Sequence, residues 1–200
     1  MSPTQAERSD TTRTALLAAG RGLFAERGYA SVSTEQIVRA SGLTRGALYH
    51  HFGGKRELFK AVFEQIEGEI VGRIPADQLD ADDPLGVLRI GIETVLDFSL
   101  DAGVQRIALE DAPSVLGYDE WREVEERYGL GLLSAGLGAA MEAGQMEPRP
   151  IEPLAHLLLG ALIVAAQYVG GADDRDGARE EMGAALHAVL DGLAAPTLGP

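Results

Sequence analysis

The residues whose types could do specific chemistry lie between Ser33 and Lys55, in the stretch STEQIVRASGLTRGALYHHFGGK. Arg45 carries a planar guanidinium group, which can make paired hydrogen bonds to a guanine edge or to a phosphate. Lys55 would place a cation at the start of a helix, where the helix dipole also attracts phosphate. We therefore expect both side chains to contact nucleic acid, the alternative for Arg45 being a solvated surface residue.

The first half of this stretch predicts a short helix. Ser33 followed three residues later by Gln36 is typical of a capping box, in which each residue satisfies a backbone N–H of the other. The apolar residues Ile37, Val38 and Ala40 are expected to face a core.

The second half predicts a tight turn and a second helix. Gly42 would supply the positive φ of the turn, Leu43 would pack between the two helices, and Thr44 would cap the second one. Residues 45–47 would then form the first turn of that helix. This is the turn that meets base edges when the second helix of a helix-turn-helix lies in the major groove.

The order of these motifs resembles the N-terminal domain of the TetR family of ligand-responsive transcriptional regulators. The resemblance covers roughly residues 12–60 and includes LFAERGYASVST before the turn and LYHHFGGKRELF after it. Two positions depart from the family pattern: Ala47 stands where a hydroxyl residue is common, and Gly54 where a capping Ser or Asn is usual. Tyr49 matches a family position that touches phosphate, although it could instead pack against Phe52. The expected DNA-binding residues are Thr34, Thr44, Arg45, Gly46, Ala47, Tyr49, His50 and Lys55.

The net charge of the chain is −14, and it is unevenly distributed. Residues 1–60 carry nine basic and five acidic side chains, a net charge of +4, whereas residues 61–200 carry eight basic and 26 acidic ones, a net charge of −18. A basic N-terminal part favours contact with a polyanion, and an acidic remainder limits nonspecific binding and aids solubility.

The sequence offers no pattern for catalysis or for a membrane span. It has no cysteine, its four histidines lack metal-site spacing with carboxylates, and its serines lack the GxSxG context. The N-terminus has no apolar signal-peptide core, and the longest apolar run, residues 157–166, has ten residues where a span needs ~20. We expect a cytoplasmic protein that is not an enzyme and needs no cofactor or metal.

Helical periodicity recurs along the whole chain, which predicts an all-α fold with two domains, residues 1–54 and 55–200. A loop is expected at Pro75 and residues 77–83, a helix start at Pro84, and a break at Pro113. The glycines within residues 119–143 indicate close helix packing or local flexibility. The expected helices cover residues 11–27, 55–73, 85–99, 104–111, 119–143, 153–169 and 175–193.

The resemblance implies that the helices at residues 85–99, 104–111 and 119–143 surround a cavity for a small-molecule effector. The polar and aromatic residues that we expect near it are Arg106, Glu110, Tyr118, Trp121 and Tyr128. An ordinary core stripe at 121 and 128, and a surface ion pair between 106 and 110, are the alternatives.

The last two helices carry more apolar surface than one helix pair can bury, which predicts a homodimer that forms a four-helix bundle. Such a dimer would read an inverted repeat as a repressor. An activator, or a regulator that answers to a protein partner, is the alternative. The expected interface residues are Leu158, Ala161, Leu162, Ala165, Leu186, Val189 and Leu190.

Overall fold

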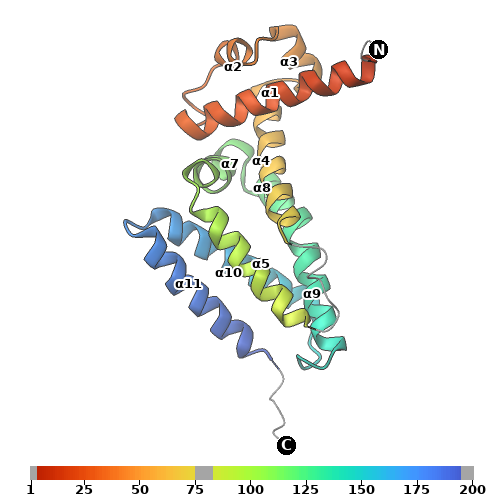
Figure 1. The fold of residues 1–200 in the computed structure, drawn as a ribbon, viewed down its shortest axis with the longest axis vertical. Coiled ribbons are helices and arrows are strands. Elements are labelled where there is room, and N and C mark those ends of the chain that lie inside the picture. Colours follow the sequence, from red (N-terminus) through yellow and green to blue (C-terminus); the bar gives the residue numbers. More distant parts are fainter. Residues whose placement is uncertain (1–3, 75–82, 195–200) are drawn as a thin grey trace, which may run out of the picture. The chain divides into compact units, whose positions relative to one another are not determined.

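The computed structural model of the chain describes residues 4–74 and 83–194, and it confirms the all-α class. In these residues the only β-pairing is an isolated antiparallel bridge between Met146 and Ala194. The α-helices, shown in Figure 1, are α1 (Gln5–Arg27), α2 (Thr34–Ser41), α3 (Arg45–Phe52), α4 (Lys55–Gly72), α5 (Pro84–Ser99), α6 (Ala102–Val104), α7 (Ala112–Leu116), α8 (Tyr118–Glu125), α9 (Gly131–Glu142), α10 (Ile151–Gly171) and α11 (Arg175–Asp191). Two π-helical segments, η1 (Gln105–Asp111) and η2 (Glu126–Leu130), lie within this series.

The chain forms two compact units that are not simple halves of the sequence. The first unit combines residues 1–66 with 102–121, and the second combines residues 67–101 with 122–200. We call them the head and the body. A single boundary between residues 54 and 55 does not describe this division, because η1, α7 and part of α4 belong to the head.

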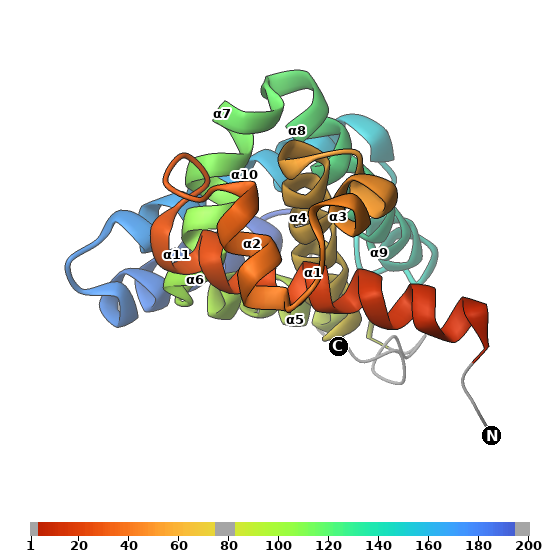
Figure 2. The same ribbon diagram turned by 90° about the horizontal axis from the view of Figure 1, so that it is seen from above.

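In the head, α2 and α3 lie side by side against α1 (Figure 1, Figure 2). The first helix begins earlier than residue 11, because Thr4 and Glu7 form a capping box. These residues are polar, so the apolar pattern did not predict this start. It ends as expected at Gly28, whose φ of 75° suits a residue without a side chain.

The helix α4 supplies most of the remaining core of the head. Five of its apolar side chains follow helical spacing and are fully buried: Leu58, Phe59, Val62, Phe63 and Ile66. The Phe59 ring meets the rings of neighbouring aromatic side chains, with centroids 5.2 Å from Phe24 and 5.1 Å from Tyr29.

The segment from α6 to α7 differs from the expected helix with a break at Pro113. The chain stays helical from residue 102 to 116 and ends at Gly117, where φ is 82°. The reason is the π-helical segment η1, whose wider turn is closed by a hydrogen bond from Ala112 N–H to Ile107 O. Pro113, which lacks an N–H, then stands in the first turn of α7, where none is needed.

The expected long helix at residues 119–143 is formed by α8, η2 and α9. Its glycines support the close-packing interpretation at two positions. A Cβ atom on Gly129 would lie 2.9 Å from Leu159 Cδ1, and one on Gly136 would lie 2.7 Å from Leu88 Cδ2. At these two places a larger residue would require a leucine side chain of α10 or α5 to move.

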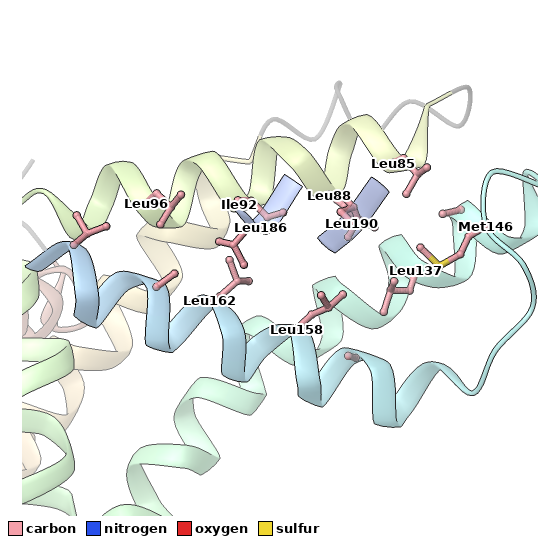
Figure 3. Packing of buried hydrophobic residues seen from close by; sticks show 14 of the residues in the cluster. Leu85, Leu88, Ile92, Leu96, Leu137, Met146, Leu158, Leu162, Leu186 and Leu190 are labelled. Carbon is pink, nitrogen blue, oxygen red and sulfur yellow. The ribbon is translucent and has the colours of Figure 1, made fainter. Parts of the chain in front are cut away.

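The core of the body is made by α5, α9, α10 and α11 (Figure 3). Pro84 begins α5, as predicted, and Asp83 caps it. Pro75 and residues 77–82 of the expected loop lie outside the described residues. Figure 3 shows the apolar side chains that these helices direct toward one another: Leu85, Leu88, Ile92, Leu96, Leu137, Met146, Leu158, Leu162, Leu186 and Leu190.

The helix α10 is the one helix of the described residues that is long and apolar enough to cross a membrane. The longest uninterrupted apolar run has only ten residues, so the sequence did not predict a helix of this length and composition. Composition alone is weak evidence for a span, since a core helix passes the same test, and α10 packs against α5, α9 and α11.

Candidate nucleic-acid interface

The predicted caps of α2 and α3 are all present. Ser33 Oγ accepts a hydrogen bond from Gln36 N–H at 3.2 Å, and Gln36 Oε1 accepts one from Ser33 N–H at 2.7 Å. Gly42 has a φ of 68°, and Thr44 Oγ1 accepts from Ala47 N–H at 3.1 Å. Local hydrogen bonds therefore fix the start of each helix, and Gly42 forms the turn between them.

The two faces of α3 differ sharply in exposure. Leu48 and Phe52 are buried and hold the helix on the head, while the opposite face is open to solvent. Arg45, Gly46, Tyr49 and His50 are exposed, and residue 47 is half-buried. The residues predicted to contact DNA thus lie on the free face of α3. In the preceding helix Ile37 is buried and Val38 is half-buried, but Ala40 is exposed, contrary to prediction.

Arg45 is already engaged within the head. Its Nη1 lies 3.2 Å from Glu35 Oε1, and its Nη2 donates to Tyr49 Oη at 3.4 Å. The guanidinium carbon lies 5.4 Å from the centre of the Tyr49 ring, so Tyr49 contacts Arg45. These contacts hold the guanidinium over the first turn of α3, and DNA would have to replace Glu35.

An open pocket of about 440 Å³ lies beside this face. Three of the expected DNA-binding residues, Thr34, Arg45 and Lys55, contribute to its wall. The complete lining is Ala30, Ser31, Val32, Ser33, Thr34, Glu35, Arg45 and Lys55.

Lys55 has a structural contact that the sequence did not predict. Its Nζ donates to Tyr29 O at 3.0 Å and to Val32 O at 2.8 Å, and it lies 3.8 Å from the centre of the Tyr29 ring. Burial lowers the pKa of Lys55, and the nearby charge of Asp111 opposes that shift. The ammonium group therefore holds the turn between α1 and α2 in place. These contacts, and not the position of Lys55 at the start of α4, are its main interactions.

Of the five residues expected around an effector, Arg106, Glu110, Tyr118 and Trp121 belong to the head, and Tyr128 belongs to the body, beside Gly68. Arg106 makes contacts that the sequence did not predict: its Nη1 donates to the backbone of α1, at 3.0 Å to Ala25 O and 2.6 Å to Glu26 O. The role of these five residues around an effector stays a prediction. Glu110 and Tyr118 are exposed, and Trp121 is buried.

Most of the expected interface residues lie in the core of a single protomer. Five of the seven are buried in the body: Leu158, Leu162, Ala165, Leu186 and Leu190. Ala161 is half-buried and Val189 is half-exposed. The dimer interface stays a prediction, because a helix that is apolar nearly all round does not reveal from its sequence which side faces inward.

A buried pair of acids in the body had no signal in the sequence. Glu67 and Glu125 are 8% and 7% exposed, and they stand on α4 and α8. Burial, and then the charge of Glu125, raise the pKa of Glu67 well above its ordinary value of 4.5. The packing of the helices, and not the neighbouring sequence, buries these two carboxyl groups and raises the pKa of Glu67.

Comparisons with known proteins agree with this geometry. Residues 86–193 match the family model described as Tetracyclin repressor-like, C-terminal domain, and residues 16–62 match that of bacterial regulatory proteins, tetR family. The crystal structure of a TetR-family transcriptional regulator from Pectobacterium atrosepticum is 34% identical, with a TM-score of 0.81, over 97% of this chain and 99% of that one.

Two further relatives extend the comparison. The Transposon Tn10 TetC protein of Escherichia coli is 26% identical over 156 residues, which are 78% of this chain and 79% of that protein. RolR, solved in complex with its ligand resorcinol, is 22% identical and shares the fold, with a TM-score of 0.70 over 98% of this chain and 99% of that one.

The capped turn, the free face of α3 and the helical body define the class of protein, a helix-turn-helix DNA-binding regulator. Within that class the matches to both family models and to the Pectobacterium structure decide the family. The chain belongs to the TetR family of transcriptional regulators. Regulators of this family are soluble DNA-binding proteins and not enzymes.

Proposed function

We propose that the protein is a homodimeric cytoplasmic repressor, which reads an inverted-repeat operator and leaves it when a small molecule binds. The free face of α3 carries this proposal, because it presents Arg45 in the first turn and Tyr49 one turn later, on a helix whose other face is held by the buried Leu48 and Phe52. In a helix-turn-helix regulator this turn meets base edges, and Arg contacts guanine most often. Thr34, Thr44, Gly46, Ala47, His50 and Lys55 complete the proposed DNA surface.

An exposed apolar face of α10 and α11 supports the dimer. Leu157, Val164 and Tyr168 are 72%, 61% and 53% exposed on α10, and Val189 is 52% exposed on α11. Residues 157, 161, 164 and 168 follow helical spacing, so they share one face of α10. Large apolar side chains exposed in such a row are typical of an interface, and a two-fold dimer would present two α3 helices to a two-fold site.

The effector is proposed to be a neutral or cationic, mainly apolar compound bound by the body. RolR binds resorcinol in the same fold, which supports a small-molecule ligand. The net charge of −18 on residues 61–200 disfavours anions. Tyr128 is the expected ligand residue that the body itself holds. Because an effector shifts an equilibrium only by its differential affinity, it must bind the DNA-free form more tightly.

Selection of duplexes from random-sequence DNA tests the proposal. The recovered sites should be inverted repeats, and the DNA upstream of the protein's own gene should contain one. Neutral and cationic lipophilic compounds are then screened for quenching of the fluorescence of Trp121, the single tryptophan, and for release of the selected duplex. Recovery of no preferred sequence at low salt would defeat the repressor proposal, and quenching without release would defeat its effector half.

A further inference from the structure

The turn between α1 and α2 is held from two sides at one residue. Tyr29 N–H donates to Asp111 Oδ2 at 2.7 Å, and Tyr29 O accepts from Lys55 Nζ at 3.0 Å. The same Nζ donates to Val32 O at 2.8 Å, directly before the cap of α2. Both backbone polar groups of Tyr29 are therefore bound by charged side chains, which make stronger hydrogen bonds than neutral partners do.

The end of α1 is held by η1, the π-helical segment that also contains Asp111. The last carbonyls of a helix have no partner within it, and Arg106 donates to two of them, Ala25 O at 3.0 Å and Glu26 O at 2.6 Å. Gly28, which follows, has a φ of 75°, a backbone conformation that favours glycine.

The π-helical geometry of η1 explains how Arg106 and Asp111 reach the same turn. Residues five apart are bonded neighbours across one turn of a π-helix, whereas an α-helix would turn them about 140° away from each other. Both residues stand in η1, so they face the end of α1 together. Short π-helical segments are often found at functional sites.

We infer that Asp111 and Arg106 are positioning residues for DNA reading. They lie far from α3 in the sequence, yet they fix the end of α1 and the turn that leads into α2, while Lys55 fixes the residue before Ser33. The start of α2 sets where the following turn and the exposed face of α3 stand. A looser clamp would leave α3 folded but less well placed for specific contacts.

Electrostatics gives this inference a test in which a positioning role and simple charge act in opposite directions. DNA is a polyanion, so removal of a carboxylate from the head should strengthen binding if charge alone matters. Loss of the Tyr29 contact should weaken specific binding instead. Glu110 offers a matched control, because it is an exposed carboxylate in the same segment.

The experiment compares Asp111→Ala, Asp111→Asn and Glu110→Ala in the full-length chain. Affinity is measured for a duplex that the wild-type protein selected from random-sequence DNA and for a duplex of unrelated sequence. Asp111→Ala should lose about tenfold or more for the selected duplex, the equivalent of one charge-assisted hydrogen bond, with little change for the unrelated one. Asp111→Asn keeps an acceptor and should stay near wild type, and Glu110→Ala should bind equally or more tightly.

Hydrogen exchange at the Tyr29 amide reports on the clamp without DNA. The amide should be protected in the wild-type protein and in Asp111→Asn, and it should exchange faster in Asp111→Ala. Arg106→Ala should also reduce the preference for the selected duplex, whereas Arg149→Ala, with the same change in charge on an exposed residue of the body, should not.

Two outcomes would overturn the inference separately from the proposed function. If Asp111→Ala bound the selected duplex as tightly as the wild type, the positioning role would be wrong while the DNA-binding function stood. If Asp111→Ala and Asp111→Asn lost the same affinity, the interaction of the Asp111 charge with Lys55 would be responsible, and the role given to the Tyr29 hydrogen bond would be wrong. A wild-type protein that selected no sequence would instead refute the proposed operator recognition and this inference with it.

Discussion

At the scale of single residues, Arg45 joins the local structure to the function. It stands in the first turn of a helix with a satisfied cap, and its guanidinium lies between Glu35 and Tyr49. Both partners are exposed, so the ion pair is worth little by itself. In the proposed function, its effect is to hold the group in place until DNA offers better partners.

Arg45→Ala should weaken binding to the selected operator by about 1–3 kcal/mol and relax the preference at one base position. The helix itself should remain, because Thr44, Leu48 and Phe52 are unchanged. A titration against the operator and against single-base variants of it gives the measurement. Arg149→Ala, equal in charge but located in the body, is the control, and an equal loss in both variants would contradict a base contact.

Glu35→Gln should strengthen binding to all DNA, by about twofold to fivefold, since an exposed ion pair contributes at most ~1 kcal/mol. The change frees Arg45 and removes a negative charge from the pocket wall. The gain should be larger for unrelated sequences than for the operator, so discrimination falls. Weaker binding of the unrelated duplex would show that Glu35 orients Arg45 and does not compete with DNA for it.

At the scale of elements, the body shows why an apolar helix can be interpreted in two ways. The inward side of α10 carries Leu158, Leu162 and Ala165, which fill the protomer core, and the outward side carries Leu157, Val164 and Tyr168. Both sides are apolar, and only the first is needed for the protomer to fold. The second is therefore the side that a partner subunit would cover.

Leu157→Arg should separate the dimer without unfolding the protomer, because the side chain is 72% exposed. Leu162→Arg would bury a charge in the core of the body and should unfold it, so it is not a test of the interface. Sedimentation at micromolar concentration and far-ultraviolet circular dichroism distinguish the two results. A Leu157→Arg protein that stayed dimeric and bound its operator normally would show that the interface lies elsewhere.

At the scale of the whole molecule, the charges are arranged for two tasks. The basic residues 1–60 favour DNA, and the acidic remainder repels it. Within that acidic part, Glu67 and Glu125 are buried near each other, which is costly unless a carboxyl group keeps its proton. Burial of these carboxyl groups therefore lowers the stability of the folded protein by an amount that varies with pH.

Glu67→Gln should stabilise the protein at neutral pH. Because the pKa of Glu67 is raised in the folded state, the folded protein holds a proton that the unfolded chain releases above about pH 4.5. Stability is thus greatest below that pH and falls as pH rises toward the folded-state pKa. The variant should remove this fall and raise Tm by about 2–4 °C for each kcal/mol gained. Thermal unfolding from pH 4.5 to 8 measures it.

Glu152→Gln, at an exposed carboxyl group of α10, is the control for the loss of one charge and should leave the pH profile unchanged. If Glu67→Gln lowered the stability at neutral pH, the buried carboxylate would have to be charged and bound in the folded protein, contrary to the direction of its pKa.

The sequence by itself determined the parts of this protein whose partners are neighbours along the chain. The Ser33 and Gln36 capping box, the turn at Gly42 and the Thr44 cap each depend on groups within three residues or on one φ angle, so the printed residues specify them directly. The apolar stripe of α4 follows in the same way from helical spacing. These local rules were enough to predict the two helices of the helix-turn-helix, and the resemblance of the motifs indicated the family.

Only the tertiary structure decided the contacts that join distant residues. Asp111 accepts a hydrogen bond from Tyr29, which is 82 positions away in the sequence. The π-helical geometry that directs Asp111 toward Tyr29 depends on a backbone hydrogen bond that the residue types do not predict. Likewise, the inward side of α10 and the burial of Glu67 depend on which helices pack against them. Local hydrogen bonds are set by composition and spacing, whereas burial and long-range pairing result from how the whole chain fills its core.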